Sequence, residues 1–221
     1  MEYRVVETFV SINGEGQWAG ELAVFIRLAG CNLNCNYCDT TWANEETVSY
    51  QRMTKEMIGE YVEHTGVNHV TVTGGEPLIQ PGIRELLDYL GGLPKVQVEV
   101  ETNGSATIAP YANMEHRPAF TLDYKLPGSG MEAYMKMENY AYLTEKDTVK
   151  FVVSNREDLE KAKTIIETFQ LQGKCGIYLS PVFGRIEPAE IVEYMIEHRL
   201  NQVHVQLQLH KFIWAPDQRG V

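Results

Sequence analysis

Short apolar runs recur along the chain with the spacing typical of alternating strands and helices. Strands are predicted at residues 23–28, 70–73, 96–100, 120–123, 149–153, 176–179 and 203–207. Several of these runs end in a polar or glycine-rich turn. Helical patterns lie between them, at residues 54–64, 83–90, 156–169 and 188–198. This alternation predicts an α/β fold with a mainly parallel sheet, in which ligands bind at the carboxyl ends of the strands.

The chain of 221 residues is long enough to bury one full core, and no repeat, low-complexity tract or linker divides it. We therefore expect a single domain over residues 1–221. Residues 127–130 predict a flexible loop. The segment behind it, residues 131–137, is compatible with a lid or a surface helix, and the pattern favours the surface helix.

The composition excludes some classes of partner. The formal net charge is −11, so nucleic acids and anionic membranes, which are polyanions, are not expected as main partners. A small-molecule substrate fits this charge better. The first residues lack a basic segment followed by an apolar run, and 18 apolar residues never follow one another. We therefore expect a cytoplasmic protein with reduced thiols.

Three of the four cysteines, Cys31, Cys35 and Cys38, form a C-x3-C-x2-C loop directly after a predicted strand. A structural zinc or iron-sulfur site is closed by four protein ligands, whereas a reactive metal keeps one coordination position open. Three thiolates therefore indicate a reactive cluster rather than a structural one.

Two structural alternatives remain for this loop. A disulfide would leave an odd thiol in the trio, and a zinc site would need a distant fourth ligand such as His64, His69 or Cys175. No second ligand pair of similar spacing follows the loop. Cys175 stands alone before an apolar strand, which is typical of a core residue, so we leave it out of the site.

The cysteine loop, a strand and the segment Gly-Gly-Glu-Pro at residues 74–77 together resemble the radical S-adenosylmethionine superfamily. The resemblance implies an incomplete (β/α) barrel and a [4Fe-4S] cluster held by Cys31, Cys35 and Cys38. It also implies S-adenosylmethionine bound to the fourth iron, where the cluster supplies an electron that releases a 5'-deoxyadenosyl radical.

Within that superfamily the chain resembles the 7-carboxy-7-deazaguanine synthases over nearly its whole length. The similar segments are residues 9–16, 25–31 and 38–40, together with His210 near the carboxyl end. The resemblance implies ring contraction of 6-carboxy-5,6,7,8-tetrahydropterin to 7-carboxy-7-deazaguanine with release of ammonia, in queuosine and 7-deazapurine biosynthesis. The alternatives are a glycyl-radical activating enzyme and, in another class, a non-catalytic metal-binding or electron-transfer protein.

The resemblance also implies roles for individual residues. Arg27 has a planar, permanently charged group suited to bidentate capture of the substrate carboxylate. Thr40 resembles a magnesium ligand, although a helix cap explains it equally well from local sequence. Substrate contacts are implied for Ile12, Asn13, Gly14, Glu15, Arg27, Thr73, His210 and the carboxylate of Val221. Contacts with S-adenosylmethionine are implied for Gly75, Glu101, Asp123, Tyr124, Lys125 and Ser180. No protein nucleophile is required.

The chain departs from the family pattern at three places, one of which is the tail over residues 214–221, longer than in the shortest members. Asn13 stands where glutamine is usual, one methylene shorter, and Asp-Tyr-Lys at residues 123–125 stands where many relatives have Ser-Pro-Lys. These changes affect individual contacts more than the reaction. The resemblance further implies a flavodoxin-like or other reductant for the cluster, and a homodimer, because relatives form one.

Overall fold

The structure, a computed structural model, describes residues 1–216 and 218–221. In this part of the chain nine strands form one sheet, in the order β3-β1-β2-β4-β5-β6-β7-β8-β9. The strands are β1 Glu2–Ile12, β2 Leu22–Leu28, β3 Gln51–Thr54, β4 His69–Gly74, β5 Gln97–Thr102, β6 Ala119–Tyr124, β7 Thr148–Val153, β8 Gly176–Pro181 and β9 His204–Val205. The α-helices are α1 Lys55–Thr65, α2 Ile83–Gly91, α3 Arg156–Thr168, α4 Pro188–His198 and α5 His210–Ile213. Short 3-10 helices include η1 Thr41–Asn44, η2 Pro77–Ile79 and η5 Glu132–Tyr134.

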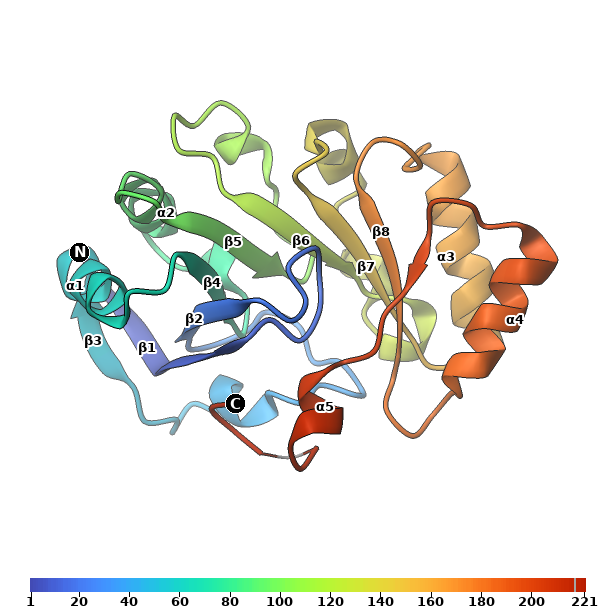
Figure 1. Cartoon of the computed structure of the whole chain (residues 1–221), viewed down its shortest axis with the longest axis horizontal. Helices are drawn as coiled ribbons and strands as arrows, with labels where there is room; N and C mark the ends of the chain where they lie inside the picture. Colours follow the sequence, from blue (N-terminus) through green and yellow to red (C-terminus); the bar gives the residue numbers. More distant parts are fainter. Residues whose placement is uncertain (217) are drawn as a thin grey trace.

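The sheet is parallel over most of its width. Each neighbouring pair from β2 to β9 is parallel, whereas β1 runs antiparallel to both β2 and β3. The sheet curves, with α1 and α2 outside its first half and α3 and α4 outside its second half (Figure 1). Since β3 and β9 lie at opposite ends of the strand order, the barrel does not close. The structure confirms the predicted incomplete barrel with a mainly parallel sheet.

Local sequence explains where the helices begin and end. The Thr54 hydroxyl caps α1 by accepting a hydrogen bond from Met57 N at 3.3 Å, and Gly66 ends the helix with a φ of 67°. Helix α4 begins at Pro188, where a missing N–H costs nothing, and has a capping box between Glu187 and Glu190. Its bounds are those the sequence predicted.

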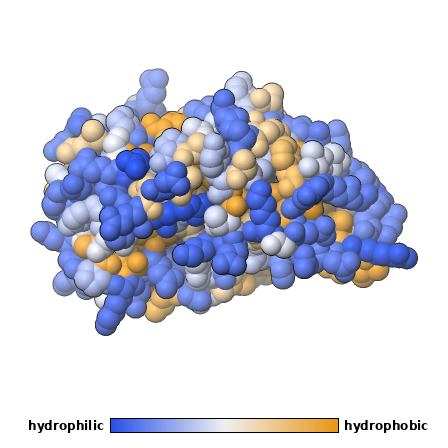
Figure 2. Space-filling view, turned by 90° about the horizontal axis from the view of Figure 1, so that it is seen from above, coloured by the Kyte–Doolittle hydropathy of each residue, from blue (hydrophilic) through white to orange (hydrophobic). Residues whose placement is uncertain are grey.

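The core lies between the sheet and the helices. Ile26 of β2, Val72 of β4 and Phe151 of β7 are buried there against apolar residues of α1, α2 and α3. The face in Figure 2 carries mostly hydrophilic side chains, with smaller apolar patches between them. Among the helices of the described residues, none combines the length and apolar content that crossing a bilayer requires.

Three features differ from the sequence prediction. Strands β1 and β3, which extend the sheet at one edge, were not predicted. The run at 203–207 forms only the two-residue strand β9. The predicted surface helix at 131–137 is wrong, because the 3-10 turn η5 forms at 132–134 and another 3-10 helix, η6 Met137–Tyr142, begins at the end of the segment.

Candidate active site

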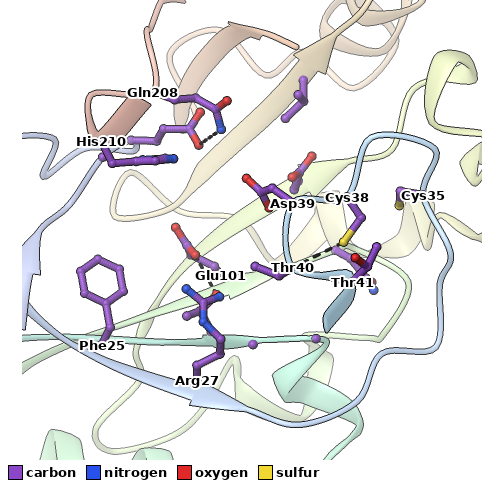
Figure 3. A pocket seen from close by; sticks show the side chains of 18 of the residues that line it. Phe25, Arg27, Cys35, Cys38, Asp39, Thr40, Thr41, Glu101, Gln208 and His210 are labelled. Carbon is purple, nitrogen blue, oxygen red and sulfur yellow. Dashed lines mark hydrogen bonds between the residues drawn. The ribbon is translucent and has the colours of Figure 1, made fainter. Parts of the chain in front are cut away.

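A cavity of about 740 Å³ opens at the carboxyl ends of the parallel strands, between the cysteine loop and the carboxyl-terminal residues. Figure 3 shows its side chains pointing into one shared space, with Arg27 and Glu101 on one side and His210 and Gln208 on another. Most of the predicted site residues line it: Ile12, Gly14, Glu15, Arg27, Cys31, Cys35, Cys38, Thr40, Thr73, Gly75, Glu101, Asp123, Lys125, His210 and Val221. The structure therefore brings together residues from both ends and the middle of the chain.

Three predicted residues do not line this cavity. The side chain of Asn13 is buried below it and accepts a hydrogen bond from Thr71 Oγ1 at 2.9 Å. Tyr124 points to the other face of β6, as strand alternation requires, and its hydroxyl donates to Glu132 at 2.8 Å. Ser180 is fully buried beside Glu15. The contacts of Asn13 with substrate and of Tyr124 and Ser180 with cofactor stay predictions, and both Asn13 Nδ2 and Ser180 Oγ are buried without a hydrogen bond among the described residues.

All four cysteines have free thiols, so the chain has no disulfide among its described residues. Cys31 Sγ accepts hydrogen bonds from Leu33 N and Asn103 Nδ2, both at 3.5 Å. Burial raises the pKa of the Cys31 thiol and of the Cys35 thiol, and the Lys125 charge opposes this rise at Cys35. Amide donors aimed at a sulfur are a feature of thiolate ligands to iron-sulfur clusters.

The donor set fits a cluster better than a single metal ion. Among the described residues, no three His, Cys, Asp or Glu side chains converge on one point as mononuclear zinc requires. In a [4Fe-4S] cluster each thiolate binds a different iron, so wider spacing is expected. His64, His69 and Cys175 lie outside the cavity lining, which leaves the zinc alternative without its fourth ligand. Burial raises the pKa of Cys175 to about 12, consistent with a core thiol.

The turn after β4 is held by a fully buried carboxylate. Glu76 accepts hydrogen bonds from Leu78 N at 2.9 Å, Thr102 Oγ1 at 2.7 Å and Asn103 N at 2.7 Å. It thereby joins the end of β4 to the end of β5 and places Asn103 beside Cys31.

At Gly75 any side chain would collide with the backbone oxygen of Gly30, so glycine lets this turn lie against the start of the cysteine loop.

A buried chain of alternating charges crosses the cavity floor. Lys150 Nζ lies 3.2 Å from Glu15 Oε2 and 3.8 Å from Asp123 Oδ2, and Lys125 Nζ donates to Asp123 Oδ2 at 2.8 Å. Burial alone would raise the pKa of Glu15, but the Lys150 charge, the nearby Ser180 hydroxyl and the Gln208 amide together lower it to about 2. Glu15 is therefore an anion at neutral pH.

Glu15 also has an unused acceptor. Its Oε2 accepts hydrogen bonds from Lys150 and, at 3.1 Å, from Gln208 Nε2. Its Oε1 and the Ser180 hydroxyl are both buried and make no hydrogen bond within the described residues. A buried acceptor without a partner is costly, so Oε1 needs a donor, which the neighbouring Ser180 hydroxyl or an N–H group of a bound molecule can supply.

The pKa of Glu101 shifts in the opposite direction to that of Glu15. Burial raises its pKa, and the negative charges of Glu99 and Glu15 add to the rise, while Lys150 and a hydrogen bond from Thr73 Oγ1 at 2.8 Å oppose it. The cavity thus holds one carboxylate fixed as an anion and another that accepts a proton more readily.

The carboxyl-terminal residues form one wall of the cavity. Leu209 N donates a hydrogen bond to Gly14 O at 3.1 Å. His210 therefore lies directly against Gly14, and a Cβ atom at residue 14 would collide with Nδ1 of the imidazole. Burial lowers the pKa of His210. His210 begins α5 rather than ending a strand. Beyond it, Arg219 stacks on the Trp42 ring, with 4.1 Å from Cζ to the ring centroid.

Thr40 lies at the start of η1 but makes no side-chain cap hydrogen bond. Its hydroxyl lies 3.6 Å from Cys38 Sγ and lines the cavity. The cap explanation is therefore not supported, and the hydroxyl oxygen is available to a ligand.

Several polar residues that line the cavity were not predicted from the sequence, among them Glu7, Lys150 and Gln208. A signal existed for Lys150, because a charge inside the apolar run 149–153 is expected only where it has a partner. Glu7 lies in the strand that the pattern did not predict. Gln208 gave no local signal, since its role depends on contact with Glu15.

The model of the Radical SAM superfamily matches residues 25–123. A 7-carboxy-7-deazaguanine synthase of Clostridium acetobutylicum is 56% identical over 100% of both chains. The chain belongs to the 7-carboxy-7-deazaguanine synthase family. A relative of the same name from Chlorobaculum tepidum is 40% identical and covers 98% of this chain and 96% of its own.

Solved structures support the fold. The crystal structure of QueE from Escherichia coli superposes with a TM-score of 0.73 at 22% identity and covers 94% of both chains. SuiB of Streptococcus suis, solved with bound S-adenosylmethionine, gives a TM-score of 0.56 at 13% identity, over 80% of this chain and 44% of that one. The predicted family, enzyme class and radical SAM fold are confirmed. Family membership implies a [4Fe-4S] cluster and S-adenosylmethionine, which the free thiols and the unpaired acceptors in the cavity fit.

Proposed function

We propose that this protein contracts the ring of 6-carboxy-5,6,7,8-tetrahydropterin to give 7-carboxy-7-deazaguanine and ammonia, in queuosine or 7-deazapurine biosynthesis. The relatives named 7-carboxy-7-deazaguanine synthase support this assignment. The observation that carries it is the cavity itself, in which three free thiols share one lining with the Arg27 guanidinium and the buried carboxylate of Glu15. We also infer that residues 1–221 form one domain, because a single sheet includes strands from both ends of the chain.

We infer that Cys31, Cys35 and Cys38 hold the cluster, with the Asn103 and Leu33 amides tuning the Cys31 sulfur. When bound there, the cluster and S-adenosylmethionine would supply the 5'-deoxyadenosyl radical needed for hydrogen abstraction at the pterin C6. Gly75 gives the cofactor close access to backbone at the end of β4. Asp123, Lys125 and Glu101 supply polar contacts from the adjoining strand ends.

One end of the substrate is recognised by anionic groups. The pterin presents a guanidine-like edge rich in N–H donors, and Glu15 presents Oε1 without a partner while Lys150 and Gln208 hold Oε2. Backbone groups of Ile12 and Gly14 flank Glu15 at the cavity wall. His210, which lies against Gly14, and Val221 also line the cavity and are further substrate contacts in this proposal.

The other end of the substrate carries a carboxylate, which Arg27 binds through its planar fork. Thr40 supplies a hard oxygen for magnesium, which combines few protein oxygens with substrate oxygens and water. A Thr40→Val variant keeps the shape and removes the oxygen. We expect it to need at least tenfold more magnesium for half-maximal activity, whereas Thr40→Ser stays near wild type.

The proposal is tested by an anaerobic assay of reconstituted protein with reductant, S-adenosylmethionine, magnesium and 6-carboxytetrahydropterin. Mass spectrometry should detect 7-carboxy-7-deazaguanine, and the Cys35→Ala variant should make none. Formation of 5'-deoxyadenosine without product would keep the radical chemistry and reassign the substrate, with a glycyl-radical activating enzyme as the next candidate.

Three further assignments belong to this proposal. A flavodoxin-like or other small reductant supplies the electron, as the family resemblance implies. The protein works as a homodimer, as its family resemblance implies. It works in the cytoplasm, where its four free thiols stay reduced.

A further inference from the structure

Glu7 and Arg27 form an ion pair at the cavity wall. Glu7 Oε2 accepts a hydrogen bond from Arg27 Nε at 2.9 Å, and the two side chains are only 20% and 16% exposed. The two terminal nitrogens of Arg27 make no hydrogen bond among the described residues. The Glu7 carboxylate therefore binds the guanidinium at Nε, and the two terminal nitrogens of Arg27 face the cavity.

A β-bulge in β1 creates this arrangement. Val5 pairs with Leu28 and Glu7 pairs with Arg27, so Val6 is an extra residue opposite a single step of β2. Without the bulge, Val5 and Glu7 would face the same side of the sheet, because side chains alternate with a period of two. With it, Val5 enters the core with Tyr3 while Glu7 enters the cavity.

The residues beyond the bulge brace the same arginine. Phe9 stacks on Phe25 with ring centroids 4.9 Å apart, and the Arg27 guanidinium carbon lies 6.0 Å from the Phe9 ring centroid. Both rings line the cavity. Arg27 is thus restrained on one side by an aromatic face and at Nε by a carboxylate, which fixes the direction of its fork.

We propose that Glu7 is a positioning residue for substrate binding, which orients Arg27 so that its terminal nitrogens meet the substrate carboxylate. The inference rests on the proposed function, in which Arg27 binds that carboxylate. Glu7 acts through its hydrogen-bond geometry rather than through its charge, since its negative charge by itself would repel an anionic substrate.

Two variants separate geometry from charge. Glu7→Gln keeps an oxygen at the same reach that can accept from Nε but removes the charge, and we expect its KM to stay within about threefold of wild type. Glu7→Asp keeps the charge but is one methylene shorter, and we expect its KM to rise about tenfold or more with kcat nearly unchanged, because binding alone is misaligned. The reverse pattern would overturn the proposal.

A double-mutant cycle tests whether Glu7 acts through Arg27. In an Arg27→Ala background, Glu7→Asp should have no further effect on KM. A persisting effect would mean that Glu7 contacts substrate directly or supports the fold, and would overturn the proposal. If wild-type enzyme makes no 7-carboxy-7-deazaguanine, the proposed function fails instead.

The chain offers a matched control in the same strand. Glu2 forms an ion pair with Arg52 at 3.6 Å on the exposed edge, far from the cavity lining. Glu2→Asp should leave KM unchanged. Thermal unfolding of all variants detects a loss of folding, and Glu7→Gln keeps the proposal testable if Glu7→Asp does not fold.

Discussion

Gly14 is a residue at which one methyl group should alter the active site. A Cβ there would strike His210 Nδ1, so Gly14→Ala should displace the carboxyl-terminal wall and raise the substrate KM about tenfold or more. Gly92→Ala is the control, because Gly92 has a φ of −80° and ordinary 3.4 Å clearance. Steady-state kinetics of both variants check this, and equal KM values would contradict it.

Glu15 should make stability depend on pH in acid. Its pKa falls from an ordinary value of 4.5 to about 2 in the folded protein, so its contribution is complete above 4.5 and is lost as the pH falls toward 2. The difference in free energy of unfolding between wild type and Glu15→Gln should shrink as the pH falls through this window, by up to about 1.4 kcal/mol per pH unit. Urea denaturation between pH 6 and the acid limit of folding measures it. A constant difference would mean that Glu15 is not held as an anion.

Single residues also show where sequence reasoning stops. Arg27, the cysteines and Glu15 could be predicted because each carries chemistry visible in a local motif. Asn13 lies in the same motif as Glu15, yet its amide turns toward Thr71, which no local pattern reveals. Lys150 could have been found from its isolation in an apolar strand.

At the scale of elements, Glu76 should couple the turn after β4 to the cysteine loop. In Glu76→Gln the side-chain amide N–H₂ faces a backbone N–H from which the Glu76 carboxylate accepts a hydrogen bond. This mismatch lowers the free energy of unfolding by about 1–3 kcal/mol. We expect lower stability in urea and less iron bound after anaerobic reconstitution, because Asn103 loses its anchor beside Cys31. Glu193→Gln on the exposed face of α4 should change neither value. Unchanged iron content in Glu76→Gln would disprove the coupling.

Most helices and the parallel strands could be predicted because one side of each is apolar and the period is regular. Strand β1 was not predicted, because the bulge at Val6 shifts the alternation of apolar and polar side chains along it. Its cavity side also carries polar residues such as Glu7. Strand β3 is four residues long at an edge, too short for a periodic signal. The residues predicted at the strand ends did converge, because a parallel sheet gathers its carboxyl ends at one edge.

At the scale of the whole molecule, the carboxyl-terminal tail should serve substrate binding more than folding. Arg219 stacks on Trp42, and Val221 lines the cavity. Removing residues 215–221 should raise the substrate KM at least tenfold while leaving the free energy of unfolding within about 1 kcal/mol. Cleavage of S-adenosylmethionine without substrate should continue at a similar rate, which serves as the internal control. Removing Val221 alone should give a smaller KM effect, because Arg219 remains.

The hydrogen bonds that join residues 14 and 16 to residues 209 and 206 span almost the entire sequence. Contacts at such separation carry a large loop-closure cost and form late in folding. During synthesis the three cluster thiols leave the ribosome long before Gln206, Gln208 and Leu209, which contact residues 14–16. A prematurely terminated chain therefore contains the complete cluster motif but lacks the wall that recognises substrate.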